Sequence, residues 1–256
     1  MRLSDDSDAG KGGQFATTCW SAVLLSAQSQ APGSDNAREE FCQLYWYPLY
    51  AFIRRRGYNA DDARDLTQGF FLSILDRKTL KRATPEKGKF RSFLLASLKN
   101  YLSNVYQHEN AIKRGGKIDF VSVDFSDGED RYSREPSDAL TPEKIFDANW
   151  AISLLAQALE RLKAEYSAQG KGNIFETLRP FLDLSGAAQA PSYDVVSERL
   201  KVSNAGVKTL IHRFRKRYSD TLREAVAQTV TDPTEIDDEI RSLCEALIAS
   251  EGRLSP

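Results

Sequence analysis

Cysteine and histidine, the residues that most often bind transition metals, are scarce in this chain, with three and two among 256 residues. Cys19, Cys42 and Cys244 have no metal-ligand spacing, and an odd set of scattered thiols predicts no disulfide framework. His212 lies inside a basic segment, where it is expected to pack or to approach a phosphate. The sequence therefore predicts no metal site and no cofactor.

Long apolar runs are also absent, and the first residues are polar and acidic, which predicts neither a transmembrane helix nor a signal peptide. We expect a cytoplasmic protein without a membrane partner. The chain has no Gly-rich phosphate loop and no nucleophile–base pair, so an enzyme with a small-molecule substrate is the least favoured class, and no catalytic residue is predicted.

The formal net charge of −1 conceals four blocks of strongly unequal charge. Residues 77–117 hold 11 Lys and Arg against 2 Asp and Glu, a balance of +9, and residues 199–223 hold 8 against 1, a balance of +7. Residues 118–147 have a balance of −6 and residues 224–251 one of −7. Two basic blocks separated by acidic ones indicate two anion-binding surfaces, although charged helix faces also arise simply by solvation.

The second basic block contains a segment typical of a DNA-recognition helix. Residues 204–218 place Val207, Leu210, Ile211 and Phe214 at helical spacing, with most of the cations off that face. Ser203 is a suitable N-cap, and a second short amphipathic helix over 193–200 precedes it after only a few residues. Two helices joined by so short a turn, the second one basic, predict a helix-turn-helix.

Helical periodicity extends over most of the chain, and no segment requires a strand. We expect an all-α fold of two helical domains, residues 37–116 and 142–231, joined by an acidic flexible linker over 117–141. A leader over 1–36 should hold one short helix at Trp20–Ala27, and 232–256 should form an acidic C-terminal helix and tail. Pro48 predicts a kink or a break near Tyr47.

The helix expected over 59–75 has an apolar face, and Asp65, Thr67 and Gln68 lie off that face, where they are free for a partner or for water. The helix expected over 90–106 carries cations and aromatic residues together. Single-stranded nucleic acid is bound by cations along its backbone and by aromatic faces on its bases.

At this point the motifs resemble those of bacterial RNA polymerase sigma factors of the extracytoplasmic-function class. The similar segments are Tyr47-Pro-Leu-Tyr50, Arg54-Arg-Arg-Gly-Tyr58, Asp65-Leu-Thr-Gln68, Phe90-Arg-Ser-Phe-Leu-Leu-Ala-Ser-Leu-Lys-Asn100, Val207-Lys208 and His212-Arg213-Phe214-Arg215. The resemblance covers roughly 41–116 and 140–230. It implies two helical domains that bind core polymerase, through its β′ clamp and β flap, and promoter DNA; an anti-sigma factor is a further partner that it allows.

The resemblance also implies three sets of site residues. For the polymerase clamp they are Asp65, Leu66, Thr67, Gln68 and Phe71. For the single-stranded −10 element they are Arg91, Lys99, Asn100, Tyr101, Asn104, Lys113 and Arg114, with core packing as the alternative role of Tyr101. For the −35 element they are Ser203, Asn204, Lys208, His212, Arg213, Arg215, Lys216 and Arg217; the early residues should face bases and the later ones phosphates.

Some positions depart from the family pattern. Lys201 stands where the family usually has Gly, and a left-handed backbone there would cost on the order of 1 kcal/mol. Leu210 replaces a frequent polar residue, and Phe93 a frequent Trp. The acidic tail could fold back on a basic surface and mask DNA. The alternative function is a stand-alone helix-turn-helix regulator whose N-terminal domain binds an effector or dimerises.

Overall fold

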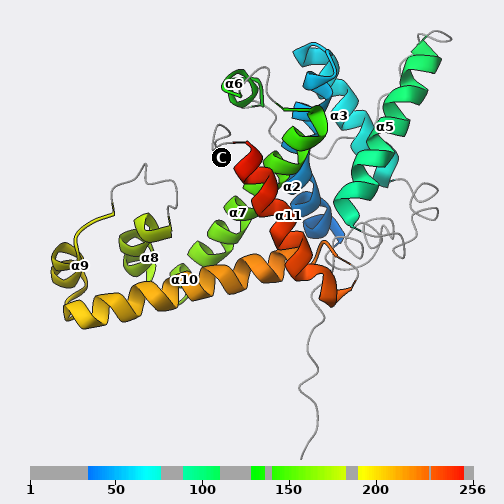
Figure 1. Ribbon diagram of the computed structural model, residues 1–256. Coiled ribbons are helices and arrows are strands. Elements are labelled where there is room, and N and C mark those ends of the chain that lie inside the picture. Colours follow the sequence, from blue (N-terminus) through cyan, green and yellow to red (C-terminus); the bar gives the residue numbers. More distant parts are fainter. Residues whose placement is uncertain are drawn as a thin grey trace, which may run out of the picture.

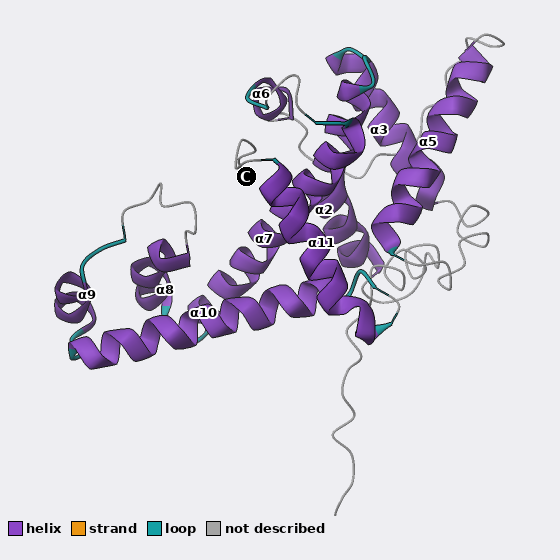
Figure 2. Ribbon diagram, in the orientation of Figure 1, coloured by secondary structure: helices purple, strands orange, loops and turns teal. Residues whose placement is uncertain are grey.

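The computed structural model describes residues 34–75, 89–109, 128–135, 140–182, 190–230 and 232–250, and within these ranges it has helices and no strand (Figures 1 and 2). The all-α prediction is confirmed. The helices are α2 (Ser34–Arg55), α3 (Ala60–Leu75), α5 (Phe90–Glu109), α6 (Gly128–Ser133), α7 (Pro142–Ala168), α8 (Gly172–Leu178), α9 (Tyr193–Leu200), α10 (Asn204–Ala227) and α11 (Ile236–Ala249), with 3₁₀ turns η2 (Arg179–Leu182) and η3 (Pro233–Glu235). The leader, including the short helix expected at 20–27, lies outside the described residues.

Helix boundaries follow the capping signals of the sequence. Asn59 Oδ1 accepts the Asp62 N–H at 2.8 Å before α3, and Thr141 accepts the Lys144 N–H at the start of α7, with Pro142 as the first helical residue. Each cap satisfies a backbone donor that the first helical turn leaves unpaired. After α2 the chain turns at Gly57, whose φ of 93° favours glycine.

α2 is continuous from Ser34 to Arg55 with Pro48 inside it, so of the kink or break predicted near Tyr47 the break is wrong. Every residue from Tyr47 to Ile53 is buried, so α2 is enclosed by other helices on almost all sides. Burial on this scale outweighs the roughly 3 kcal/mol that proline costs within a helix.

The largest apolar cluster joins helices from both sides of the expected linker. It packs α2, α3 and α5 against Phe146 and Trp150 of α7, Val226 of α10 and Leu243 of α11. A second cluster holds α8, η2 and α9 against the first half of α10, through Val207, Phe214 and their neighbours. α10 and α7 therefore contribute to both clusters, and α11 folds back across α7 from the far end of α10 (Figure 1). The predicted division into two domains is not shown by this arrangement.

Part of the expected linker is a helix that docks on α2. Glu129 and Glu135, in and just after α6, form ion pairs with Arg54 and Arg55. The expectation of an exposed flexible linker is therefore wrong for residues 128–135, because acidic residues that suggested solvation instead find cations on α2. Residues 117–127 and 136–139 lie outside the described ranges.

Close packing of α3 against α5 depends on Gly69. A Cβ at this position would overlap the hydroxyl of Tyr101, while the Tyr101 Cζ atom would lie at 3.5 Å, an ordinary contact. We expect Gly69→Ala to lower the free energy of unfolding by about 1–3 kcal/mol, since overpacking outweighs the better helix propensity of alanine. In a Tyr101→Phe background, which removes only the hydroxyl, the same substitution should cost little. Urea unfolding of the unaltered protein, the two single variants and the double variant measures this coupling. Equal losses in both backgrounds would contradict the contact.

Candidate nucleic-acid interface

The turn between α9 and α10 is only three residues long, Lys201 to Ser203. Lys201 has a φ of 54° and is the sole non-glycine residue with positive φ among the described residues, so it adopts the left-handed backbone that favours Gly. Two hydrogen bonds between Ser197 and Val202 hold it: the Val202 N–H donates to the Ser197 carbonyl at 3.1 Å, and the Ser197 hydroxyl donates to the Val202 carbonyl.

α9 is fixed against the first half of α10 by apolar and polar contacts. Val196 of α9 and Val207, Ile211 and Phe214 of α10 are buried in the second cluster. At the start of α10, Ser203 Oγ accepts the Gly206 N–H at 3.2 Å and confirms the predicted cap. The Asn204 amide nitrogen donates to Asp194 of α9 at 2.7 Å, so this predicted base-reading residue also holds the two helices together.

The solvent face of α10 carries a stripe of cations. Lys208, Arg213 and Lys216 are exposed on the side of the helix away from the buried residues, and the His212 side chain is exposed beside them. Within the described part of the chain they form no ion pair. A helix end held rigidly by its partner, with unneutralised cations along one face, is suited to a phosphate backbone and to the major groove of a duplex. We call Lys208, Arg213 and Lys216 the α10 stripe.

Arg215 and Arg217 have structural contacts instead. Arg215 Nε donates to the Phe181 carbonyl of η2 at 3.0 Å. Arg217 Nε donates to Glu165 of α7 at 2.8 Å and its Nη1 to Glu224 at 3.2 Å, and the hydrogen bond to Glu165 raises the pKa of Arg217. These two side chains tie α10 to its neighbours, so the stripe excludes them.

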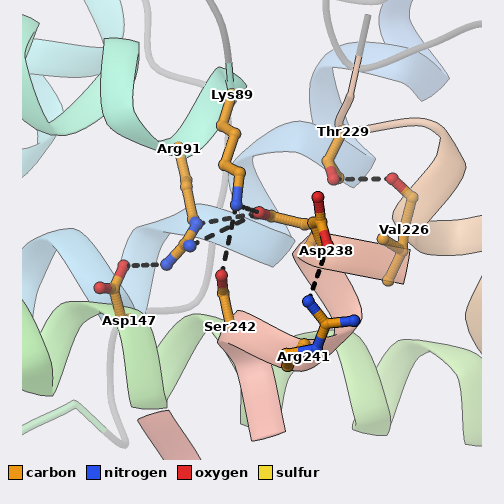
Figure 3. Close-up of polar contacts among 9 residues, drawn as sticks. Lys89, Arg91, Asp147, Val226, Thr229, Asp238, Arg241 and Ser242 are labelled. Atoms are coloured by element: carbon orange, nitrogen blue, oxygen red, sulfur yellow. Dashed lines mark hydrogen bonds and ion pairs between the residues drawn. The ribbon is translucent and has the colours of Figure 1, made fainter. Parts of the chain in front are cut away.

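Arg91, predicted to bind the −10 element, is buried in an ion-pair cluster (Figure 3). Its Nη1 lies 2.5 Å from Asp147 of α7, and its Nε lies 2.8 Å from Glu239 of α11, in an ion pair rather than an aligned hydrogen bond. Lys89 Nζ lies 2.6 Å from the other Glu239 oxygen, and it donates to Ser242 at 3.3 Å. Burial raises the pKa of Asp147, while Arg91 opposes that shift.

The other residues predicted for the −10 element are placed differently. Lys99 pairs with Glu143 of α7 at 2.8 Å, and Asn100 and Asn104 are exposed on α5. Tyr101 is half-buried, with its ring 5.7 Å from that of Phe70, and burial raises its pKa, so core packing describes it in this structure. Lys113 and Arg114 lie outside the described residues.

The residues predicted for the polymerase clamp are only partly accessible. Asp65 is exposed, and Leu66 and Gln68 are half-buried on α3. Phe71 is buried with its ring edge-on to Phe41 at 5.5 Å. Thr67 is fully buried, and its hydroxyl donates to the Ala63 carbonyl at 2.6 Å, so the expectation that its side chain is free for a partner is wrong.

Residue-level reasoning from the sequence missed the acidic partners of these cations. Three cations of the first basic block are paired with acids elsewhere in the chain, namely Glu239, Asp147 and Glu143. Two arginines of α2 are paired in the same way with Glu129 and Glu135. The signal was present in the alternation of basic and acidic blocks, which allows pairing within the chain as readily as separation from nucleic acid.

Within the described ranges no helix is long and apolar enough to cross a membrane, and no group of three or more Cys, His, Asp or Glu could hold a metal ion. Comparison of the chain with protein-family models, with curated proteins and with solved structures finds no match.

Proposed function

We propose that this protein is a promoter-recognition subunit of bacterial RNA polymerase that acts in the manner of a sigma factor. The observation that carries the proposal is the α9–α10 pair, with its three-residue turn, capped second helix and unpaired cationic stripe. This geometry supports binding of a duplex through α10. The order of the motifs along the chain, from Asp65-Leu-Thr-Gln68 through α5 to α10, supports polymerase binding and promoter melting as the context of that contact.

Exposed residues of α3 and α5 support the proposed contacts with polymerase and with single-stranded DNA. Asp65 and Gln68 on α3 present polar groups to a polymerase surface. Asn100 and Asn104 are exposed one turn apart on the same side of α5, and the Tyr106 side chain, 68% exposed, lies on roughly the opposite side of the helix. Amide groups can hydrogen-bond an unstacked base, and an exposed aromatic ring can stack on it. We therefore assign the single-stranded contact to these residues, rather than to the buried Arg91.

Substitution of the exposed α3 residues tests the assignment to polymerase. We expect Asp65→Ala and Gln68→Ala each to weaken binding of core polymerase about tenfold, the effect of losing one hydrogen bond at an interface, while duplex affinity stays unchanged. Asp61→Ala, an exposed acid on the same helix, is the matched control. The measurements are affinity capture of core polymerase and transcription from mapped start sites with reconstituted enzyme.

A chain that binds duplex DNA but neither binds core polymerase nor supports transcription would overturn this proposal. It would favour the stand-alone regulator, for which the selected sites should be palindromic, with half-sites about one helical turn apart. A chain that binds core polymerase normally in both α3 variants would contradict the role of α3 alone.

A further inference from the structure

α6 lies on the C-terminal half of α2 and is held there mainly by polar and aromatic contacts. Glu129 accepts two hydrogen bonds from Arg54, at 3.0 and 2.6 Å, and a third from the Tyr50 hydroxyl. The hydrogen bonds from Arg54 keep the pKa of Glu129 low. Burial and Glu129 raise the pKa of Tyr50 to about 12, so this hydroxyl remains a donor. Arg54 and Tyr50 thus form one complete anion site.

A second anion site holds the carboxylate of Glu135. The Tyr47 hydroxyl donates to Glu135 Oε1 at 2.7 Å, Asn149 of α7 donates to the same oxygen at 2.7 Å, and Arg55 donates to Oε2 at 3.5 Å. Glu135 is almost fully enclosed, with 4% of its side chain exposed.

An aromatic ring lies between these carboxylates in the sequence. The guanidinium groups of Arg54 and Arg55 lie 4.5 and 5.2 Å from the centre of the Tyr132 ring. On α2, the Tyr47 ring in turn receives the guanidinium of Arg131 at 3.8 Å. α2 therefore offers two sites for anions and, between them, two guanidinium planes on which a flat ring stacks.

The docking of α6 also has an unfavourable contribution. Nε and Nη2 of Arg131 are buried and have no hydrogen-bond acceptor among the described residues, and burial lowers the pKa of Arg131. Burying guanidinium nitrogens without acceptors is unfavourable. Within 128–135, Gly128 is buried against the Trp46 ring, the Glu135 side chain is only 4% exposed and Tyr132 packs against the main core, so release of α6 would expose these three groups.

We propose that the Tyr47–Tyr50–Arg54–Arg55 face of α2 is a binding site for single-stranded nucleic acid, and that α6 occupies it in the free protein as an intramolecular mimic. Glu129 and Glu135 take the places of two phosphates, and Tyr132 takes that of a base. Arginine binds phosphate and carboxylate with the same bidentate geometry, and bases stack on guanidinium planes and aromatic rings.

This inference rests on the proposed function for its choice of ligand, because an acidic helix from another protein would present similar chemistry. Single-stranded DNA is favoured because this face combines two anion sites with two guanidinium groups on an aromatic ring, the combination of phosphate and base contacts that a nucleic-acid strand makes. α6 is joined to α2 by the same chain and so competes at high effective concentration.

The test measures binding of fluorescein-labelled oligo(dT) of about 20 nucleotides, long enough to span this face of α2, by fluorescence anisotropy with the full-length chain. Affinity should rise at least about tenfold in Glu129→Gln/Glu135→Gln, and also in a variant with residues 128–135 replaced by Gly-Ser residues of equal length. This is the gain expected if α6 occupies the site in about nine of ten molecules of the unaltered chain and no longer competes in the variants. Adding Arg54→Ala/Arg55→Ala to the Gly-Ser variant should abolish the gain. Asp130→Asn/Glu245→Gln removes the same charge from two exposed acids and should bind as the unaltered chain does.

Three outcomes would overturn the inference: no gain in the Gly-Ser variant, an equal gain in the Asp130→Asn/Glu245→Gln control, or tight binding of a peptide of residues 126–137 to the Gly-Ser variant while oligo(dT) binds no better. The last would make α2 a protein-binding surface. Duplex affinity, measured in parallel, depends on the α10 stripe and not on α6. If the unaltered chain did not bind duplex DNA, the proposed function would be contradicted. If it bound duplex DNA but the variants showed no gain for oligo(dT), only the proposed site on α2 would be contradicted.

Discussion

Glu239→Ala is expected to lower the free energy of unfolding by about 3–5 kcal/mol, the usual cost of removing one member of a buried ion pair. The Glu239 side chain is 1% exposed and meets Lys89 and Arg91, and the Arg91 side chain is itself only 10% exposed. Without the carboxylate, Asp147 alone remains to neutralise two cations (Figure 3). Urea unfolding followed by circular dichroism measures the loss.

Asp238→Asn is the matched control for that substitution. Asp238 neighbours Glu239 on α11 and is exposed, and among the described residues its ion pair is with Arg241 at 2.8 Å. Exposed pairs one turn apart contribute about 0.5 kcal/mol or less, so this variant should unfold almost as the unaltered protein does. A loss below about 1 kcal/mol for Glu239→Ala would mean that water reaches the cluster and that α11 is weakly docked.

The acidic C-terminal segment shows which features a sequence pattern predicts and which it does not. An acidic C-terminal helix was predicted within 232–256, and α11 occupies Ile236–Ala249. A basic target for it was an open hypothesis. The structure places Glu239 on Lys89 and Arg91, at the first turn of α5, and Asp237 on Arg223, rather than on the α10 stripe. Local patterns set the charge of a helix, whereas tertiary packing decides which cations it meets.

The same distinction explains Thr67 and the α9–α10 turn. Thr67 lies off the apolar stripe of α3, yet it is fully buried because α3 is covered on more than one side and the hydroxyl finds a carbonyl four residues back. Around Lys201 the determinants are local: a cap at Ser203, a short connection and a helix end. They predicted the bounds of α9 and the start of α10 correctly, whereas α10 continues beyond the predicted residue 218 to Ala227; the left-handed position of Lys201 was considered only through the resemblance, as a place where the family has Gly.

The prediction of a flexible linker was wrong for residues 128–135 because their partners lie far away in the sequence. Residues 118–147 are acidic, which predicts a solvated segment, but the pairs of Glu129 and Glu135 are arginines more than 70 positions earlier in the chain. α7 likewise buries Phe146 and Trp150 against α2. Periodicity identifies the apolar face of such a helix and gives no information on which distant helix covers it.

Removal of the α10 stripe should have the largest effect on nucleic-acid binding. We expect Lys208→Ala/Arg213→Ala/Lys216→Ala to lower affinity for duplex DNA on the order of a hundredfold at low salt and to reduce the slope of log K against log salt by about three, one for each phosphate that the protein no longer neutralises. The three side chains are exposed and unpaired within the described part of the chain, so stability should change by no more than about 0.5 kcal/mol. Anisotropy titrations at several salt concentrations measure the affinity and the slope.

Three other exposed cations provide the matched comparison for the stripe. Lys144→Ala/Lys163→Ala/Arg241→Ala removes the same net charge from α7 and α11. If general attraction between a cationic protein and DNA were responsible, the two triple variants would lose affinity and slope equally. A loss confined to the stripe variant would assign duplex binding to the exposed face of α10. Both variants lose three positive charges, so only the position of the lost charges could explain the difference.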